Sequence, residues 1–342
     1  MTNKDKRSPT MKDVAQLAGV SQTTVSFVLN NLSEAGIPQE TQQRVWAAIE
    51  QLGYRPNAMA QGLRRQRTNT LGFVTDEIAT TPYAGQILEG AQDAAWENDK
   101  ILLVVNTKGN PALEARALEI LLDRKVDGII YATMYHRPVN PPKTLRDIPT
   151  VLLDCFAEDR SYPSVVPDEV QGGYDATKYL LEKGHRRIGY INNWNDIPAT
   201  VGRLQGYQKA LADFEVAFNE NLVYMELNEV ESLQGYDGAM HLMQVSEPPT
   251  AFFCFNDRTA MGVYDALRKL NLSIPKDVAV MGFDNQDIIA AYLYPPLTTM
   301  QLPHYAMGEW AVRHLIDVLD GEPNSSPVQH RIECPLIERA ST

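Results

Sequence analysis

Residues 10–30, TMKDVAQLAGVSQTTVSFVLN, constrain the fold of this chain more than any other stretch, because two short apolar repeats flank a turn residue. Val14, Leu17 and Ala18 recur at helical spacing and predict a first helix with one apolar face. Gly19 supplies the backbone freedom that a sharp turn requires. The segment therefore predicts a helix, a tight turn and a second helix.

The second helix of this segment carries a small and mostly polar outer face. Thr10 and Ser21 can cap the two helices, because a hydroxyl oxygen accepts a hydrogen bond from a free backbone N–H at a helix start. Val25, Val28 and Leu29 form the apolar face that turns inward. The residues predicted to point outward are Gln22, Thr23, Ser26, Phe27 and Asn30.

Such a helix, held at an angle by a partner helix, suits the major groove of DNA. An ordinary αα-hairpin has a similar composition and is the alternative. A third predicted helix begins at Pro38 and ends at Gly53, and it places Val45 on an inward face. Three small helices can then share one aliphatic core. This arrangement favours a compact DNA-binding headpiece over residues 10–55.

The distribution of charge agrees with a phosphate-bearing partner at one end of the chain only. The whole chain has a formal net charge of −12 and a sequence pI near 5.0. Residues 1–70 hold nine Lys or Arg and five Asp or Glu, a net of +4, which leaves −16 for the remainder. A basic module on an acidic body confines the attraction for phosphate to that module. Residues 1–9 are expected to form a disordered tail.

Cysteine usage and hydropathy favour a cytoplasmic protein with no membrane partner. Cys155, Cys254 and Cys334 are far apart and suit reduced thiols rather than a disulfide framework. The N-terminus MTNKDKRSPT lacks the apolar segment of a signal peptide, which a transport-type binding protein would need. No run reaches the ~20 apolar residues of a membrane helix.

An enzyme is a second alternative that the sequence does not favour. The six histidines are scattered without metal-ligand spacing. No nucleophile elbow or P-loop occurs, and no dinucleotide motif follows a predicted strand. We therefore expect no catalytic activity, no metal and no cofactor.

From Leu71 onward, short apolar strands alternate with amphipathic helices. The predicted strands include LGFV, ILLVV, DGIIYAT, TVLLD, RIGYIN, AFFCF and VAVMGF, and helices are predicted around residues 172–183 and 203–213, among others. This alternation predicts parallel sheets covered by helices on both faces. The units are too many for one compact sheet. We expect two lobes within residues 71–342, the second spanning roughly 172–298 plus a C-terminal return.

Polar side chains gather where the predicted strands end, and in open α/β sheets ligands bind at such ends. These positions are Asp76, Asp154, Asn192 to Asn195, Asn256, Asp257, Asp284 and Asn285. With Arg203 at the start of a helix, they suit a neutral polyhydroxylated ligand between two lobes, on which Tyr83 or Trp194 can stack. Structural roles are the alternatives, because Asp257 can cap the next helix and Arg203 can form a salt bridge between the lobes.

The chain resembles the lactose- and purine-repressor (LacI/GalR) family of bacterial transcription regulators over nearly all of residues 10–340. The most specific motifs are KDVAQLAGVSQTTVSFVLN, the hinge-like YRPNAMAQGL, LEKGHRRIGYI, RLQGYQKAL, and IPKDVAVMGFDN followed by PPLTTM. The resemblance implies a helix–turn–helix headpiece, a hinge helix and linker over residues 56–70, and a two-lobed core like a periplasmic binding protein. It also implies a homodimer that binds double-stranded, palindromic operator DNA. A small-molecule effector controls this binding, and a sugar or sugar derivative is the favoured effector.

The resemblance also implies roles for individual residues. The positions that match base-contacting residues are Gln22, Thr23 and Phe27. Those that match phosphate contacts are Thr10, Ser21, Thr24, Ser26, Asn30 and Asn57, and the hinge adds Ala58, Gln61 and the minor-groove wedge Leu63. The effector contacts fall on Tyr83, Asp154, Asp168, Arg203, Asn256 and Asp284.

Two departures from the family pattern leave the DNA sequence and the ligand open. Phe27 stands where several relatives have Arg or His, so a bidentate guanine contact is missing and contact with a thymine methyl is the alternative. Val230 stands where lactose- and purine-type members place an aromatic that stacks on the ligand. A nucleobase or a protein partner therefore remains an alternative controller, and the sign of the control stays open.

Overall fold

The computed structural model describes residues 9–29, 36–54, 67–81, 84–226, 230–321 and 326–342. The chain divides into two compact units, residues 1–68 and 69–342. The predicted DNA contacts Asn30, Asn57, Ala58, Gln61 and Leu63 and the predicted stacking residue Tyr83 lie outside the described residues.

The first unit contains the three predicted helices, α1 (Met11–Ala18), α2 (Gln22–Leu29) and α3 (Gln39–Leu52). Their buried core consists of Val14, Ala15, Ala18, Val25, Val28, Val45, Ala48 and Tyr54. Gly19 and Gly53 end α1 and α3 in the left-handed conformation, with φ of 63° and 61°. Glycine adopts this conformation without the steric cost that a Cβ brings.

Two predictions for this unit are wrong at the level of single side chains. Leu17 was expected on the inner face of α1 but is 45% exposed, because α1 buries only Val14, Ala15 and Ala18. Ser26 was expected to point outward from α2, but it is 8% exposed and lies between the buried Val25 and the half-buried Phe27. An eight-residue helix that contacts two neighbours buries a wider stripe than the pattern of aliphatic residues indicates.

Side chains form hydrogen bonds at the starts of α1 and α2. The Ser21 hydroxyl accepts a hydrogen bond from the Thr24 backbone N–H at 3.0 Å, as predicted. At α1 the Asp13 carboxylate accepts hydrogen bonds from both the backbone N–H and the hydroxyl of Thr10, at 2.7 and 2.6 Å. Both devices satisfy polar groups that the first helical turn leaves without intrahelical partners.

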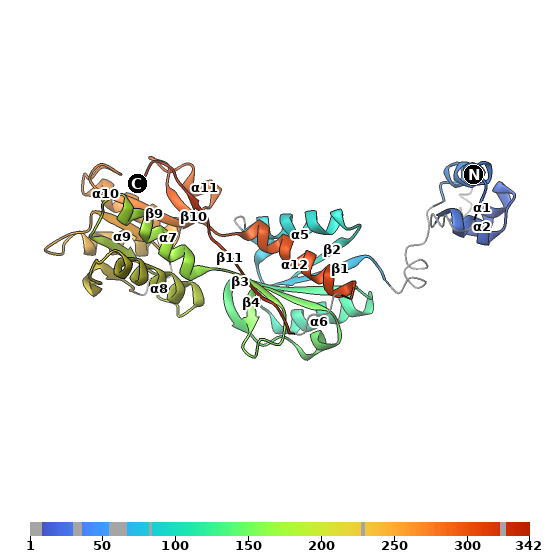
Figure 1. The fold of residues 1–342 in the computed structure, drawn as a ribbon, viewed down its shortest axis with the longest axis horizontal. Coiled ribbons are helices and arrows are strands. Elements are labelled where there is room, and N and C mark those ends of the chain that lie inside the picture. Colours follow the sequence, from blue (N-terminus) through green and yellow to red (C-terminus); the bar gives the residue numbers. More distant parts are fainter. Residues whose placement is uncertain (1–8, 30–35, 55–66, 82–83, 227–229, 322–325) are drawn as a thin grey trace, which may run out of the picture. The chain divides into compact units, whose positions relative to one another are not determined.

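The second unit contains two six-stranded sheets, each with its own hydrophobic core. The two sheets belong to two lobes, which we call the N-lobe and the C-lobe (Figure 1). The sheet of the N-lobe has the order β11-β5-β4-β3-β1-β2, and that of the C-lobe has the order β12-β10-β9-β8-β6-β7. The N-lobe strands are β1 (Thr70–Thr75), β2 (Ile101–Asn106), β3 (Gly128–Val139), β4 (Thr150–Ala157), β5 (Ser164–Pro167) and β11 (Gln329–Ile332). The C-lobe strands are β6 (Ile188–Ile191), β7 (Val223–Tyr224), β8 (Ala251–Cys254), β9 (Ala279–Asp284), β10 (Thr298–Gln301) and β12 (Leu336–Ile337).

Strand pairing in both sheets is parallel apart from the short antiparallel pair of β10 and β12, so the predicted fold class is confirmed. The helices near the N-lobe are α5 (Gly85–Glu97), α6 (Pro111–Asp123) and α12 (His304–Leu319). Those of the C-lobe are α7 (Glu169–Glu182), α8 (Pro198–Asp213), α9 (Glu231–Leu242), α10 (Asp257–Lys269) and α11 (Asp287–Ala290). The 3-10 turns are η2 (Ile78–Thr80), η4 (Lys143–Asp147) and η5 (Glu220–Leu222).

The chain passes between the lobes at three points, namely from β5 into α7, from β10 into α12, and from β11 into β12. Consequently α12, which follows a C-lobe strand, packs against α5 in the N-lobe (Figure 1). Two helices begin earlier than predicted, α7 at Glu169 and α8 at Pro198. None of the described helices is both long and apolar enough to span a bilayer.

Candidate functional site

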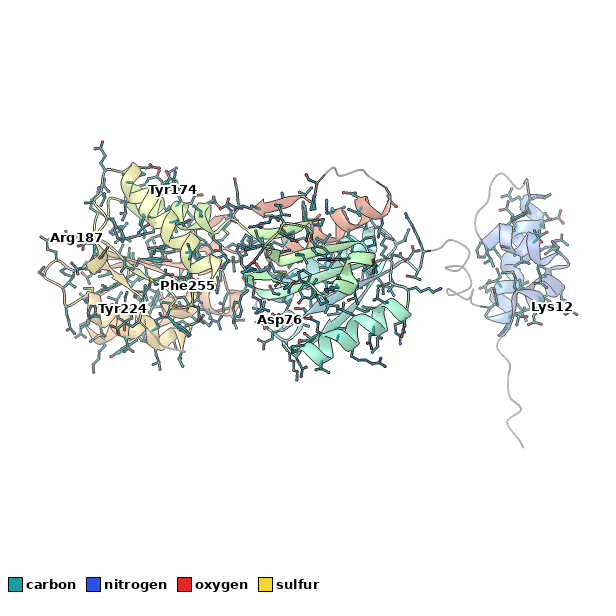
Figure 2. The ribbon with its side chains drawn as sticks, turned by 90° about the horizontal axis from the view of Figure 1, so that it is seen from below. Lys12, Asp76, Tyr174, Arg187, Tyr224 and Phe255 are labelled. Carbon is teal, nitrogen blue, oxygen red and sulfur yellow. The ribbon has the colours of Figure 1, made fainter. Side chains whose placement is uncertain are left out.

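A cavity of about 440 Å³ lies between the two lobes. Its N-lobe wall comes from β3 and β4, and its C-lobe wall from the segments after β6, β8 and β9 and from the starts of several helices. Figure 2 shows Phe255, which follows β8, on the side of the C-lobe that faces the N-lobe. The lining residues are Met134, Tyr135, His136, Asp154, Pro167, Glu169, Asn193, Trp194, Asn195, Ile197, Ala199, Arg203, Glu231, Gln234, Phe255, Asn256, Arg258, Asp284, Leu302 and His304.

Arg203 is the most firmly held of the predicted effector contacts. Its Nε donates to Glu169 Oε2 at 2.7 Å, and its Nη1 donates to the backbone carbonyl of Phe255 and lies 3.7 Å from Asp284 Oδ1. The guanidinium also lies over the ring of Phe283, 3.6 Å from the centroid. The side chain is 3% exposed. Arg203 was expected at the start of its helix, but it is the sixth residue of α8 and belongs to a buried network within the C-lobe.

Close packing of α7 on α8 brings Glu169 and Arg203 together. A Cβ added at Gly206 would overlap the carbonyl oxygen of Val170, and one added at Gly173 would overlap the backbone of Arg203. Burial raises the pKa of Glu169, but the positive charge of Arg203 and the hydrogen bonds from His136 and Arg203 together outweigh burial and hold that pKa below its usual range. Glu169 is therefore an ionised partner of Arg203, a role that the sequence pattern did not predict.

Asp284 ends β9 with a positive φ of 99°. Its Oδ2 accepts a hydrogen bond from Gln286 Nε2 at 3.0 Å. Burial raises the pKa of Asp284 to about 6, although Arg203 acts in the opposite direction. A carboxylate with this pKa changes charge near neutral pH and responds to what occupies the cavity.

Asp154 in β4 differs from the other lining carboxylates because no described residue donates a hydrogen bond to its buried Oδ1. It is 5% exposed and has a positive φ of 55°. Burial raises its pKa well above the ordinary value, and the nearby carboxylates Glu169 and Asp76 raise it further. A non-glycine residue in this backbone conformation costs of order 1–3 kcal/mol, and such residues cluster at functional sites.

Asn256 lines the cavity, but its amide is already engaged within the C-lobe. Its Oδ1 caps α10 by accepting from the Thr259 backbone N–H at 2.9 Å, and its Nδ2 donates to Glu231 Oε1 at 2.8 Å. Glu231 Oε2 pairs in turn with Arg258 Nε at 2.7 Å. Ligand contact by Asn256 is therefore coupled to this Glu231–Arg258 pair.

Two predicted residues have structural positions instead. Asp168 caps α7, accepting from the Gln171 backbone N–H at 3.0 Å, and it is not among the cavity-lining residues. Asp257 was expected to cap α10, but Asn256 does so. The buried Asp257 carboxylate instead accepts from the Gln286 backbone N–H and the Thr299 hydroxyl, both at 2.6 Å. It thereby fixes the loop that follows Asp284.

Aromatic side chains at the cavity offer surfaces for a ring. Trp194, predicted to stack on a ligand, lines the cavity and is 41% exposed, and Tyr135 on the N-lobe wall is 50% exposed. Val230 is 51% exposed but is not among the lining residues. The lining residues that sequence reasoning missed include His136, Glu169, Glu231, Gln234, Arg258 and His304. Their signal is weak, because most of them lie at helix starts, where charged residues are common for capping alone.

The candidate DNA-contacting face of the first unit lies on α2 and at the two helix starts. Gln22 and Thr23 are exposed, whereas Thr24 and Phe27 are partly buried. Lys12, labelled in Figure 2, is exposed on α1 beside the cap residue Thr10. These side chains offer hydroxyls, an amide and an ammonium to a nucleic acid.

Comparison with known families gives a match in each of the two units. Residues 10–57 match the family profile "Bacterial regulatory proteins, lacI family", and residues 177–342 match "Periplasmic binding protein-like domain". The transcriptional regulator RegA of Clostridium saccharobutylicum is 36% identical, with 97% of this chain and 98% of the relative covered. The repressor PurR of Vibrio atlanticus is 31% identical over 97% and 98% of the two chains, and the ribose operon repressor of Escherichia coli is 33% identical over 97% and 99%.

Two solved structures extend the comparison. A putative LacI-family regulator from Rhizobium etli is 36% identical, with a TM-score of 0.73 over 80% of this chain and 99% of the other. The CelR–cellobiose complex is 29% identical, with a TM-score of 0.67 over 98% of this chain and 100% of the other. The named relatives are transcriptional regulators rather than enzymes. The headpiece, the cavity between lobes and these similarities lead to one conclusion: the chain belongs to the lacI family of bacterial transcriptional repressors.

Proposed function

We propose that this repressor binds a palindromic operator as a homodimer in the cytoplasm and is controlled by a small sugar or sugar derivative. The observation that carries the proposal is the polar cavity between the lobes, where carboxylates, amides and guanidiniums face exposed aromatic rings. Hydroxyl groups donate to carboxylates and accept from amides and guanidiniums, while an apolar ring face stacks on an aromatic side chain.

We propose that α2 provides the contacts with the operator bases. Gln22 and Thr23 are exposed and reach base edges, and Phe27 supplies an apolar contact for a thymine methyl group. Phosphate contacts come from the helix starts at Thr10 and Ser21. The other proposed contacts are Thr24, Asn30, Asn57, Ala58, Gln61 and Leu63, together with Ser26, whose burial leaves it little surface for DNA.

Dimerisation has a candidate surface in the C-lobe. The segment around α11 exposes large apolar side chains, with Ile288, Tyr292 and Tyr294 at 70%, 82% and 90% exposure. Exposed apolar side chains close together in a chain often mark protein–protein contacts. A second copy of the chain is the proposed partner. Light scattering of wild type and of a Tyr292→Ser/Tyr294→Ser variant tests this assignment. The wild type should have the mass of a dimer, and the variant should lose it.

We propose that the ligand acts by linkage between sites. Binding changes the angle between the lobes, and that change alters the ability of residues 56–70 to fold as hinge helices on DNA. Couplings of this kind are typically ~1–3 kcal/mol. The ligand is an inducer if it prefers the conformation that binds DNA weakly, and a corepressor if it prefers the other.

A thermal-shift screen against sugars and nucleobases tests the ligand class. A ligand that binds the native state alone adds about 2.7 kcal/mol of stability at ~100 times its Kd. The sugar assignment draws support from the cellobiose complex of one relative and the ribose operon repressor, whereas the PurR similarity favours a nucleobase. Stabilisation by a nucleobase alone would replace the sugar assignment, and no stabilisation by either class would favour a protein partner.

A further inference from the structure

The charges that line the cavity do not balance. Among the described residues, the lining holds four carboxylates, Asp154, Glu169, Glu231 and Asp284, but two guanidiniums, Arg203 and Arg258. His136 and His304 are the lining histidines. The lining therefore holds twice as many carboxyl groups as guanidiniums, so the two arginines cannot pair with all of them.

Both guanidiniums are already committed to other carboxylates. Arg203 donates a hydrogen bond to Glu169 at 2.7 Å and lies 3.7 Å from Asp284, and Arg258 forms an ion pair with Glu231 at 2.7 Å. The imidazole Nδ1 of His136 lies 3.9 Å from Glu169 Oε1, so this histidine also faces a carboxylate other than Asp154. Asp154 is the lining carboxylate that these pairs leave out.

The surroundings of Asp154 reinforce this isolation. Its Oδ1 is buried and receives no hydrogen bond from any described residue, although the residue lines an open cavity. Its charged neighbours are Glu169 on α7, Asp76 after β1, Asp284 on β9 and, as the one attractive group among them, Arg203 on α8. A buried carboxylate without a partner is costly, whereas one that faces a cation and receives hydrogen bonds from it is stable.

We propose that the effector carries a protonated amine, and that this ammonium group binds the Asp154 carboxylate while the rest of the ligand lies along Trp194. This inference rests on the proposed ligand-binding role of the cavity and narrows the ligand class. It favours an amino sugar or another amine-bearing ring over a neutral sugar. It disfavours sugar phosphates, because a phosphate has the same sign of charge as the carboxylates that outnumber the arginines in the lining.

The arrangement predicts a proton-linked binding reaction. In the free protein, burial and neighbouring carboxylates favour the protonated form of Asp154. An ammonium group stabilises the ionised form, so binding releases a proton from that carboxyl to the buffer. A neutral hydroxyl supplies no such counter-charge, and its binding releases none.

The test compares amines with their hydroxyl and acetamide counterparts on the full chain. Thermal shift and titration calorimetry are run with glucosamine, glucose and N-acetylglucosamine, with the galactose set, and with ethanolamine and ethylene glycol as ring-free probes, all at matched ionic strength. We expect an amine to bind about tenfold to a hundredfold more tightly than its hydroxyl counterpart, as charge-assisted hydrogen bonds imply. Calorimetry in two buffers of different ionisation enthalpy should show proton release.

Two variants make the test specific. Asp154→Asn keeps the shape of the side chain and should abolish both the preference for the amine and the proton release. Asp168→Asn is the matched control, because Asp168 caps α7 outside the cavity lining and asparagine caps equally well. That variant should keep both properties.

The outcomes separate this inference from the proposed function. A neutral sugar that binds wild type as tightly as its amine overturns the inference and leaves the cavity as an effector site. Amine binding that Asp154→Asn does not weaken also overturns it. Failure of every probe to bind contradicts both the inference and the sugar-type effector, while operator binding by the headpiece would be unaffected.

Discussion

At the scale of single residues, the cavity lining contains side chains that already bond other protein groups and side chains that do not. Arg203 was predicted as an effector contact, yet its guanidinium already bonds Glu169 and the Phe255 carbonyl. Asp154 was also predicted as an effector contact, and its buried Oδ1 receives no hydrogen bond from any described residue. Two residues with the same predicted role therefore differ in how far the fold already uses their side chains.

Asp154→Asn should raise the melting temperature of the ligand-free protein at pH 7. The folded-state pKa of Asp154 is raised, so its contribution to stability is full below the ordinary value of ~3.9 and declines as pH rises toward the folded pKa. The difference in melting temperature between variant and wild type should therefore increase with pH above ~4. Each kcal/mol of stability corresponds to roughly 2–4 °C. Melting curves between pH 4 and 8 measure it, and a gap independent of pH would contradict this account.

Arg203→Ala should destabilise the protein strongly, because Glu169 would remain buried without its counter-charge. Breaking a buried pair from one side typically costs about 3–5 kcal/mol. The double variant Arg203→Met/Glu169→Gln removes both charges and should recover much of that loss. Urea unfolding of the two variants gives the comparison, and equal losses in both would show that packing rather than charge dominates.

At the scale of elements, close contact between helices positions the site. Helices α7 and α8 approach so tightly that glycine is required where their backbones meet, at Gly173 and Gly206. This contact holds Glu169 at the start of one helix against Arg203 in the second turn of the other. The charged network therefore depends on backbone packing as much as on electrostatics.

Gly206→Ala should destabilise the C-lobe and lower ligand affinity, because its Cβ would overlap the Val170 carbonyl oxygen and force the helices apart. Overpacking in a close-packed interior typically costs about 1–3 kcal/mol. Gly85→Ala at the start of α5 is the matched control, since nothing lies within 4 Å of the added Cβ. It should be neutral or slightly stabilising in the same unfolding measurement, and similar losses in both variants would argue against the packing explanation.

At the scale of the whole molecule, the chain combines two units with separate cores. The headpiece core of three short helices is independent of the cores of the two lobes. A fragment of residues 69–342 should therefore unfold cooperatively near the melting temperature of the full chain and bind the same effector, while losing affinity for DNA. Calorimetric melting and operator gel shifts test this, and a fragment that fails to fold would show that the headpiece stabilises the core.

Much of this organisation was predictable from the sequence, because local patterns carry it. Helical spacing with caps at Thr10 and Ser21 identified the headpiece, and glycine at the turn located its boundary. The alternation of apolar strands with amphipathic helices predicted the parallel sheets and their division between two lobes. The family motifs are local too, so the DNA-binding class followed from the first 60 or so residues.

The tertiary structure alone decided which polar residues serve the cavity. Ser26 is buried and Leu17 is exposed, the opposite of what was predicted, because neighbouring helices determine burial. Asp168 caps α7, whereas the adjacent Glu169 lines the cavity. Charge pairing and burial depend on groups that are 25 to 130 residues apart, such as Glu231 with Asn256 and Asp154 with Asp284. A local pattern contains the identity of each such group but not its distance to the others, and in a medium of low dielectric that distance determines its charge and its role.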